Sequence, residues 1–360
     1  ERGAFSHIVL RSVLDKYQYL SKQDRAFMTR LVDGTIEYML QLDYIIDSFS
    51  KTKVRKMKPF IRNLLRMSVY QIKYMDAVPD SAVCNEAVKL AKRHKFAQLS
   101  GFVNGVLRNI ARNIDSVQFD TLSIRYSMPQ WIVDRFVAAY GEKKAEEIFK
   151  AFHNKSTISI RTNLTRCTPD ELRVMLEAEG VTVTAVDELN YAFVISGFDY
   201  LNGLQSFRDG LFYVQDISSM LVAQTAAPKK GDYVIDVCAA PGGKSTHIAE
   251  LLQGSGHVLA RDLTDNKVDM IEENIERHGL NNMSAEVWDA TVPDADSAGK
   301  ADILICDLPC SGLGVLGRKK DIRYKMTPES VDELAALQRQ ILDTVHTYVK
   351  PNGVLVYSTC

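Results

Sequence analysis

The sequence predicts a multidomain protein of mixed α and α/β class, with an all-α part followed by two parts that contain β-sheets. Three observations lead to this prediction. Apolar residues in 1–115 recur at helical spacing, without strand-like alternation. Residues 156–197 combine three short strand patterns with one helix. From about residue 205, apolar strands alternate with helices, which is the pattern of a doubly wound parallel sheet.

Length and composition agree with several globular domains. A chain of 360 residues is too long for one ordinary core, so we expect two or three domains. The 46% hydrophobic and 25% charged residues are typical of a soluble protein. The sequence contains no run of about 18 apolar residues, so we expect no membrane span. The six cysteines show no CxxC pair and no histidine spacing. We therefore expect thiols in the reducing cytoplasm, with no disulfide framework and no metal site.

The net charge of −1 hides an asymmetry. Residues 1–115 carry 20 Lys and Arg against 11 Asp and Glu, whereas the remainder carries 24 against 34. A basic part beside an acidic part suggests that the first binds a polyanion. The alternative is a solvated basic face without a ligand.

The first domain is predicted to be all-α and to span residues 1–115. Its segments "RAFMTRLVDGTIEYMLQLDYIIDSF" and "KPFIRNLLRMSVYQIKYM" place apolar residues at i, i+3, i+4 and i+7. Pro59 stands near the start of the second segment, at a favourable first-turn position.

Residues 116–204 are predicted to hold two connector helices and a small α+β module. After the strand "STISIRTNLT", Thr168 and Glu171 form a capping box for a helix that stops at Gly180. Two further strands follow, "VTVTAV" and "AFVISG". A ferredoxin-like or RNA-recognition-like fold is the nearest common type.

Residues 205–360 form the predicted parallel sheet, whose first loop is "DVCAAPGGKS". Gly242 and Gly243 permit close backbone approach and lead into a helix N-terminus, which favours an anion. A nucleoside triphosphatase loop would need glycine where Cys238 stands, so that interpretation is disfavoured. The loop is also not the G-x-G-x-x-G of a dinucleotide enzyme.

Three acidic residues are predicted at successive strand ends: Asp262, Asp289 and Asp307. Ligands bind outside the carboxyl ends of such strands, and an acid at the second strand end can accept both ribose hydroxyls. Each aspartate alone is more often a cap or turn residue. Together they favour a nucleoside-bearing cofactor, with Asp289 on its adenine side.

Two cysteines are predicted beyond the ends of neighbouring strands. Cys310 lies in "DLPCSG" after Asp307, and Cys360 ends "GVLVYSTC". A lone cysteine is usually an inert small hydrophobe, which is how we interpret Cys306. The positions of Cys310 and Cys360 allow both thiols to face one crevice.

The motifs "DVCAAPGGKS", "DLPCSG" and "STC", in this order, resemble the S-adenosylmethionine-dependent RNA (cytosine-C5) methyltransferases of the NOL1/NOP2/Sun family. The helical block with "FVNGVLRNI" resembles the RNA-binding domain of the antitermination factor NusB. This pairing is similar to bacterial 16S ribosomal RNA methyltransferases and covers nearly the whole chain. The resemblance implies a NusB-like domain in 1–115 and a Rossmann-like methyltransferase domain in 205–360.

The resemblance also implies residue roles. S-adenosyl-L-methionine would be the cofactor, with Asp262 on its ribose, Lys267 nearby, Asp289 beside its adenine, and Asp307 bordering both cofactor and cytosine. Cys360 would be the nucleophile and Cys310 would assist product release. The methionine part would be held by the loop residues Cys238, Ala239, Ala240, Pro241, Gly242, Gly243 and Lys244.

The chemistry explains why such enzymes need a thiol. Cytosine carbon 5 is a poor nucleophile until a thiolate adds at carbon 6. A cation can raise the thiolate fraction, and Lys244 is one candidate. Asp307, protonated or sharing a proton with cytosine N3, would stabilise the adduct. The target base must leave its stack, so we expect single-stranded or bulged RNA.

The sequence departs from the family pattern in two places. Leu308 stands where the family usually has alanine, and the family continues well past its Thr-Cys motif, whereas this sequence ends there. We therefore expect the methyltransferase domain to be truncated at its C-terminus and the natural protein to continue.

The expected partner is 16S ribosomal RNA, without a membrane, and we expect a monomer because no coiled-coil pattern occurs. Two alternatives stay open. One is a related enzyme acting on tRNA or large-subunit rRNA, and the other is a non-catalytic RNA-binding assembly factor. Phosphate contacts are predicted from Lys51, Lys53, Arg55, Lys56 and Lys58.

Overall fold

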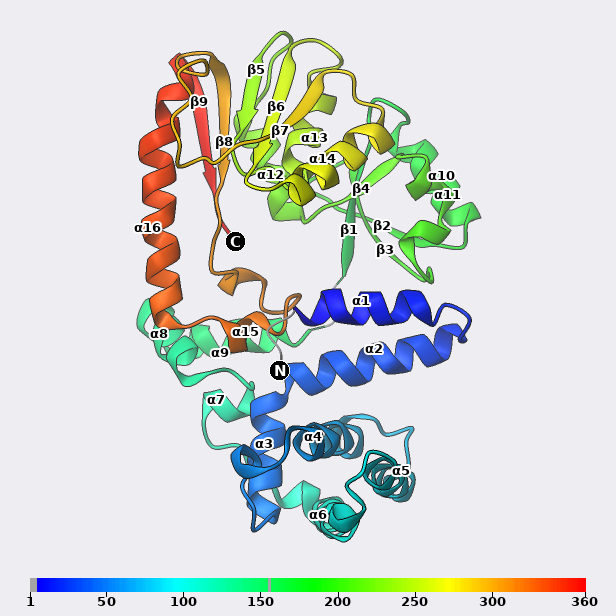
Figure 1. Ribbon diagram of the computed structural model, residues 1–360. Helices are drawn as coiled ribbons and strands as arrows, with labels where there is room; N and C mark the ends of the chain where they lie inside the picture. Colours follow the sequence, from blue (N-terminus) through cyan, green and yellow to red (C-terminus); the bar gives the residue numbers. More distant parts are fainter. Residues whose placement is uncertain (1–4, 155–156) are drawn as a thin grey trace. The chain divides into compact units, whose positions relative to one another are not determined.

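The computed structural model describes residues 5–154 and 157–360, and the chain divides into two compact units. The helical unit comprises Glu1–Lys155 and Gly312–Pro328. The α/β unit comprises Ser156–Ser311 and Glu329–Cys360. Figure 1 shows the helices of the first and the two sheets of the second. The predicted combination of an all-α part with two sheet-containing parts is confirmed.

The helical unit contains nine α-helices in residues 5–154. They are α1 (Ser6–Lys16), α2 (Lys22–Glu37), α3 (Met39–Phe49), α4 (Pro59–Tyr74), α5 (Asp80–Arg93), α6 (Ser100–Asn113), α7 (Leu122–Arg125), α8 (Gln130–Tyr140) and α9 (Glu142–Phe152). Apolar side chains at helical spacing on α3, α4 and α6 form its main core, in which Leu42, Leu65 and Leu107 are fully buried. Pro59 is the first residue of α4, as predicted.

A second core of the helical unit joins α8 and α9 to a segment from much later in the chain. Ile132 and Phe149 pack with Leu316 and with Ile322 of α15 (Ile322–Lys325). The guanidinium of Arg323 is buried there and donates to the carbonyl of Leu316 at 3.1 Å. Residues 312–328 lie within the range predicted for the methyltransferase domain. They pack in the helical unit instead, because their apolar side chains are buried among its helices.

The small sheet of the α/β unit is antiparallel, with the strand order β2-β3-β1-β4. Its strands are β1 (Ile158–Thr162), β2 (Thr182–Ala185), β3 (Ala192–Ser196) and β4 (Phe212–Val214), and its helices are α10 (Pro169–Ala178) and α11 (Gln205–Arg208). The predicted capping box of Thr168 and Glu171 is present at α10. β4 comes from beyond residue 204, so the small sheet draws its fourth strand from the stretch assigned to the next domain.

The large sheet is wholly parallel, with the order β7-β6-β5-β8-β9. Its strands are β5 (Tyr233–Asp236), β6 (His257–Asp262), β7 (Met283–Val287), β8 (Ala301–Asp307) and β9 (Val349–Ser358). The order starts at β5 and proceeds outward in both directions, which is the doubly wound arrangement that the sequence predicted.

Helices cover both faces of the large sheet (Figure 1). Val234, Ile303 and Val356 face one layer of helices, and the alternate residues Ile235 and Leu304 face the other. The first layer is α12 (Ile217–Ala226), α13 (Gly243–Leu251) and α14 (Asp265–His278), and the second is α16 (Pro328–Val345). Burial on both faces explains why β5 and β8 are continuous apolar runs in the sequence.

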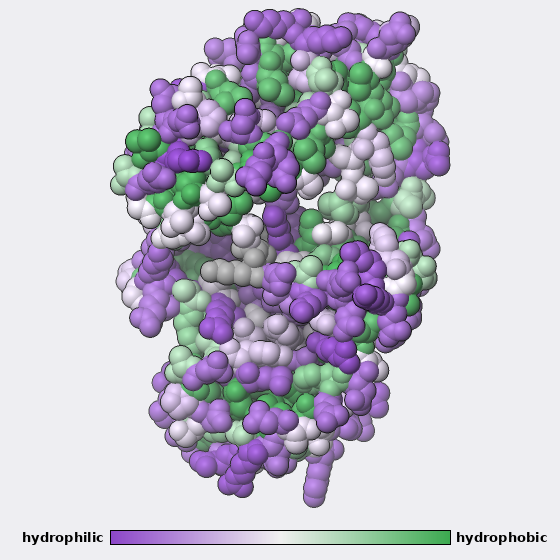
Figure 2. Space-filling model, turned by 180° about the vertical axis from the view of Figure 1, so that it is seen from behind, coloured by the Kyte–Doolittle hydropathy of each residue, from purple (hydrophilic) through white to green (hydrophobic). Residues whose placement is uncertain are grey.

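Hydrophilic side chains, with smaller groups of apolar ones between them, cover much of the face in Figure 2. Within the described residues, every helix is too short or too polar to cross a bilayer.

Two glycines of the α/β unit should respond very differently to alanine. At Gly210, with φ of +66°, a Cβ would lie 1.9 Å from the carbonyl oxygen of Arg277, whereas at Gly231, with φ of +90°, it would meet nothing within 4 Å. Gly231→Ala should cost about 1 kcal/mol of unfolding free energy from backbone strain alone. Gly210→Ala should cost about 3 kcal/mol or more, because the backbone must also move. Urea denaturation followed by Trp288 fluorescence in a Trp131→Phe background measures both. Equal costs would contradict the close approach.

Candidate active site

Polar side chains gather where the parallel strands of the large sheet end. β5 ends at Asp236, β6 at Asp262, β8 at Asp307 and β9 at Ser358. Because the strands are parallel, these carboxyl ends lie along one edge of the sheet, where ligands bind in such folds. The strand-end positions predicted for Asp262 and Asp307 are confirmed.

Asp262 is tied to the loop that follows β5. It is 4% exposed, and its Oδ2 accepts a hydrogen bond from the backbone N–H of Ala240 at 2.9 Å. Its Oδ1 accepts from the N–H of Leu263 at 2.7 Å and from Lys267 Nζ at 2.9 Å. A carboxylate has about four acceptor positions, so these bonds orient the group and leave it capacity for one hydroxyl.

Asp289 lies outside the strand that it was predicted to end. β7 stops at Val287, and Asp289 is exposed in the loop beyond it. Its Oδ1 accepts from the N–H of Thr291 at 2.9 Å and from the Thr291 hydroxyl at 2.7 Å, and these bonds lower its pKa. This local turn competes with strand pairing, which explains why the strand ends two residues earlier.

The loop Cys238–Lys244 leads directly into α13. Gly242 is the N-cap residue, with φ of +100°, and α13 begins at Gly243. The N–H of Ala239 donates to the carbonyl of Arg261 at 2.8 Å, which fixes the loop against β6. Burial raises the pKa of the Cys238 thiol to about 12, so this cysteine is a neutral side chain. The loop therefore offers backbone groups and a helix N-terminus rather than a reactive thiol.

Asp307 connects the loop after β5 to the end of β9. Its Oδ2 pairs with Lys244 Nζ at 2.5 Å, and its Oδ1 accepts from the Ser358 hydroxyl at 2.9 Å. In the parallel register of β8 and β9, Asp307 lies directly opposite Ser358. Lys244, predicted as a cation for a thiol, is thus paired with a carboxylate.

The two predicted reactive cysteines follow these neighbouring strand ends. Cys310 lies three residues beyond Asp307 and is half-buried, and Cys360 lies two residues beyond Ser358 and is exposed. Gln338 of α16 joins the two segments. Its amide donates to the carbonyl of Pro309 at 2.7 Å and accepts from the Tyr357 hydroxyl at 2.9 Å. The structure therefore brings both cysteine-bearing segments to one edge, whereas Cys306 is buried inside β8.

Asp236 was not among the predicted site residues, although it ends the strand before the glycine loop. Its Oδ2 accepts from the Ser245 hydroxyl at 2.6 Å, and its buried Oδ1 has no hydrogen-bond partner within the described residues. Burial raises the pKa of Asp236 to about 7, and the nearby Asp307 carboxylate adds to this effect. The sequence signal was a fourth aspartate at a strand end, in "YVID".

This edge fits a nucleoside-bearing cofactor. The glycine backbone ahead of α13 and the remaining acceptor capacity of Asp262 are the groups such a ligand would use. Within residues 5–154 and 157–360, no cluster of three or more His, Cys, Asp or Glu could hold a metal ion.

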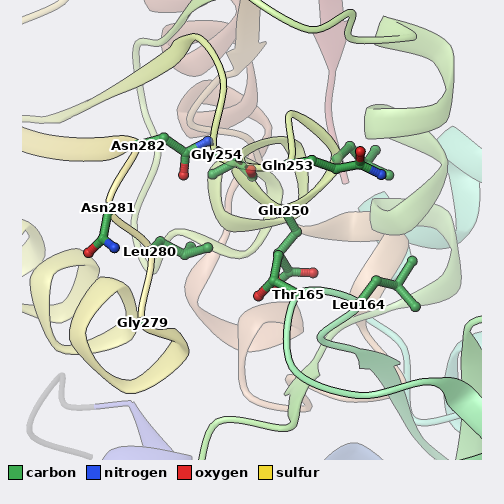
Figure 3. Close-up of a pocket in the computed structure, with 11 residues that line it drawn as sticks. Leu164, Thr165, Glu250, Gln253, Gly254, Gly279, Leu280, Asn281 and Asn282 are labelled. Atoms are coloured by element: carbon green, nitrogen blue, oxygen red, sulfur yellow. Dashed lines mark hydrogen bonds between the residues drawn. The ribbon is translucent and has the colours of Figure 1, made fainter.

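A pocket of about 440 Å³ lies at the opposite edge of the large sheet (Figure 3). It lies between Leu164 and Thr165 after β1, the C-terminal end of α13 and the Gly279–Asn282 turn that precedes β7. The C-terminal ends of α13 and α14 border this pocket, so it lacks the helix N-terminus that the strand-end loop provides.

The helical unit carries two basic surfaces. The five basic residues of 51–58 are all exposed, because Val54 and Met57 bury themselves in the core and turn the others outward. A second pocket of about 440 Å³ lies between α5 and α6. It is lined by Asn85, Val88, Lys89, Ser100, Gly101, Asn104 and Arg108.

The raised pKa of Asp236 predicts a specific pH dependence. Between about pH 4 and 7 the native protein keeps a proton that the unfolded chain has released, so this group's stabilisation is lost as pH rises towards 7. Asp236→Asn should remove that loss, so the variant gains stability relative to the wild type as pH rises. Urea denaturation at pH 5, 6, 7 and 8, followed by Trp288 fluorescence with Trp131→Phe, measures the difference. Asp269→Asn, at an exposed position of α14, is the control. A constant difference would mean that Asp236 is ionised throughout.

Family profiles cover nearly the whole chain. The 16S rRNA methyltransferase RsmB/F profile matches residues 223–360, and the NusB family profile matches residues 1–112. The ferredoxin-like domain of RsmF/B-like methyltransferases matches residues 128–198.

Relatives that match this chain over its whole length have names that agree with these profiles. The chain is 38% identical over its whole length to "Probable ribosomal RNA small subunit methyltransferase B" of Bacillus subtilis, of which it covers 81%. It is 33% identical over its whole length to the protein of the same name from Synechocystis, of which it covers 82%.

Two solved structures show related folds. PH0851 is 24% identical, with a TM-score of 0.83 over 97% of this chain and 80% of that one. A methyltransferase homolog protein from Pyrococcus horikoshii is 27% identical, with a TM-score of 0.56 over 66% of this chain and 75% of that one. With the full-length relatives, these findings establish that the chain belongs to the RsmB/F family of ribosomal RNA small subunit methyltransferases.

Proposed function

We propose that this protein methylates carbon 5 of a cytosine in 16S ribosomal RNA through a covalent adduct with Cys360. Membership of the RsmB/F family gives the reaction class, and the names of the relatives give the ribosomal substrate. The observation that supports the covalent route most directly is the position of Cys310 and Cys360. They follow the ends of two adjacent parallel strands, on either side of the Asp307–Ser358 contact.

S-adenosyl-L-methionine is the methyl donor, and when bound it supplies an electrophilic methyl group on a sulfonium. The loop Cys238–Lys244 would hold its methionine part, and Asp262 would accept its ribose hydroxyls. The Lys267 side chain is paired with the Asp262 carboxylate and is half exposed, so it can move aside when the ribose binds. The acidic strand ends suit the positive sulfonium, because Asp262 and Asp307 are each paired with one lysine and the buried Asp236 adds a third acidic group.

Cys360 provides the nucleophile in this proposal. Its thiolate adds to carbon 6 of cytosine, and the electrons of the 5,6 double bond make carbon 5 nucleophilic. Once carbon 5 carries the methyl group, a base removes its remaining proton. The double bond then re-forms, the carbon–sulfur bond breaks, and Cys360 leaves as a thiolate.

Asp307 and Cys310 assist the base and its release. Asp307 is fixed on both oxygens, by Lys244 and Ser358, so its carboxyl group can meet the polar edge of the cytosine in one orientation. Cys310 lies on the loop that Gln338 ties to β9, and it would act in the elimination that frees the product. The target base must leave its stack, and its RNA neighbours would be held by phosphate contacts on basic residues.

Replacing each cysteine should give a distinct result. Cys360→Ala should lower methyl transfer from labelled S-adenosylmethionine to unmodified 16S rRNA by about a hundredfold or more, because carbon 5 is no longer activated. Cys310→Ala should accumulate a protein–RNA adduct that resists denaturation, because product release is slowed.

Cys167→Ala is the matched control, since this half-buried thiol lies in the small module, and it should keep wild-type activity. Full activity in Cys360→Ala would mean that another residue is the nucleophile. An inactive wild-type protein that still binds 16S rRNA would favour the non-catalytic assembly factor, and activity on tRNA or 23S rRNA alone would favour the related enzyme class.

The exposed basic segment 51–58 should contribute salt-dependent RNA affinity. Arg55→Ala/Lys56→Ala should weaken RNA binding and reduce the slope of log affinity against log salt by about 1.4, or about 0.7 for each lost contact to single-stranded RNA. Fluorescence anisotropy measures the RNA affinity between about 50 and 300 mM salt, the range in which phosphate contacts dominate the affinity. Lys143→Ala/Lys144→Ala on α9 makes the same charge change at another exposed site. Lys89→Ala/Arg108→Ala tests the α5–α6 pocket in the same way. An unchanged slope in Arg55→Ala/Lys56→Ala would disprove phosphate contacts from segment 51–58.

A further inference from the structure

The buried guanidinium of Arg161 connects the small sheet of the α/β unit to the loop 238–244, the proposed cofactor loop. Arg161, the next-to-last residue of β1, is fully buried. Its Nη2 donates to Glu250 Oε1 at 2.8 Å and to Thr246 Oγ1 at 3.2 Å, and its Nε donates to Glu250 Oε2 at 3.2 Å. Its Nη1 donates to the carbonyl oxygen of Gly243 at 2.9 Å and to Gln215 Oε1. The guanidinium thus contacts both ends of α13, including the residue with which the helix begins.

A second contact comes from β4. The ring of Tyr213 lies against the loop so closely that a Cβ on Gly243 would be 2.9 Å from Tyr213 Cε1. The Tyr213 hydroxyl donates to the carbonyl of Pro241 at 3.4 Å, and Asn274 Nδ2 donates to the same carbonyl at 2.9 Å. The Arg161 guanidinium lies 5.4 Å from the centre of the Tyr213 ring. The two side chains therefore support each other and the loop.

The energetics favour a rigid attachment. A buried arginine is tolerated only when its donors are satisfied, and the bidentate pair with Glu250 is the strong, directional form of such contacts. His278 Nδ1 also lies 3.3 Å from Glu250 Oε1, and burial lowers the pKa of His278, so the histidine does not compete with Arg161 as a second cation. Moving α13 away from β1 would leave charged groups buried and unpaired.

We infer that Arg161 and Tyr213 are positioning residues that hold Pro241, Gly242 and Gly243 in the conformation that binds the cofactor. The small sheet is then a structural part of the cofactor site. The inference rests on the proposed role of loop 238–244 as cofactor-binding. A loop that is already ordered loses less conformational entropy when the cofactor binds, so more of the interaction energy contributes to affinity.

The first test uses Arg161→Lys, which keeps the charge but loses the forked geometry. Arg166→Lys is the matched control. Arg166 also joins the small module to the rest of the α/β unit, through the carbonyl of His278 at 3.0 Å, and it donates to the carbonyl of Asp209 within the module. Among the described residues it makes no hydrogen bond to loop 238–244. Binding of S-adenosylhomocysteine by calorimetry should weaken about tenfold or more in Arg161→Lys and stay within about twofold in Arg166→Lys.

Two further readouts separate positioning from general stability. The KM for S-adenosylmethionine should rise in Arg161→Lys while the KM for RNA stays unchanged. In the absence of any cofactor, amide hydrogen exchange at Gly243–Thr246 should be faster in Arg161→Lys than in Arg166→Lys. Wild-type affinity for S-adenosylhomocysteine in Arg161→Lys would overturn the inference. Failure of the wild-type protein to bind S-adenosylhomocysteine would instead overturn the proposed role of the loop.

A second pair of variants does not touch the buried charges. Gly243→Ala should weaken S-adenosylhomocysteine binding, because its methyl group collides with the Tyr213 ring. Tyr213→Val should also weaken it, because the loop then loses the ring beside Gly243 and the hydroxyl that donates to the Pro241 carbonyl. Wild-type affinity in Tyr213→Val would mean that Tyr213 does not set the loop position.

Discussion

The contact between Asp307 and Ser358 across β8 and β9 is the interaction on which the proposed chemistry depends. Parallel pairing places these residues opposite each other, and the chain beyond each then carries a cysteine. A shift of the register by one residue would reverse the faces of β9 and move Cys360 relative to Asp307. Val356 of β9 is buried in the same core as Ile303 and Ile305 of β8, and this packing favours the observed register. The geometry of the site is thus determined by the core of the sheet.

The electrostatics of the edge follow from the same arrangement. Parallel strands that each end in an aspartate bring carboxylates together, and their mutual repulsion must be balanced. Lys244 and Lys267 balance Asp307 and Asp262, whereas Asp236 is buried without a cation of its own and takes up a proton more readily. A cationic cofactor would complete this balance, which is a physical reason for acidic strand ends in the proposed sulfonium site.

Much of this site could be predicted from local sequence, because strand ends and glycine loops have local signatures. Asp262, Asp307 and the loop at Gly242 were placed correctly for this reason. Asp289 was misplaced by two residues because its Asx turn with Thr291 ends pairing early. The partner of Lys244 could not be predicted, because residues 63 positions apart meet only through the strand order. Arg161 did leave a signal, as a charged residue inside an apolar strand, but its partners lie 54 to 89 positions away.

The proposed division of labour between the units follows from the kinds of contact that each can make. Phosphate contacts from exposed lysines and arginines supply affinity and depend on salt, but they carry no information about the base. Selection of a cytosine requires fixed hydrogen-bonding groups, and in the α/β unit those are held by strand ends and buried pairs. The exposed basic residues of 51–58 are mounted on a turn and can follow a flexible backbone. Asp307 is fixed on both oxygens, so discrimination of the base should depend on the α/β unit even where most of the affinity comes from the helical unit.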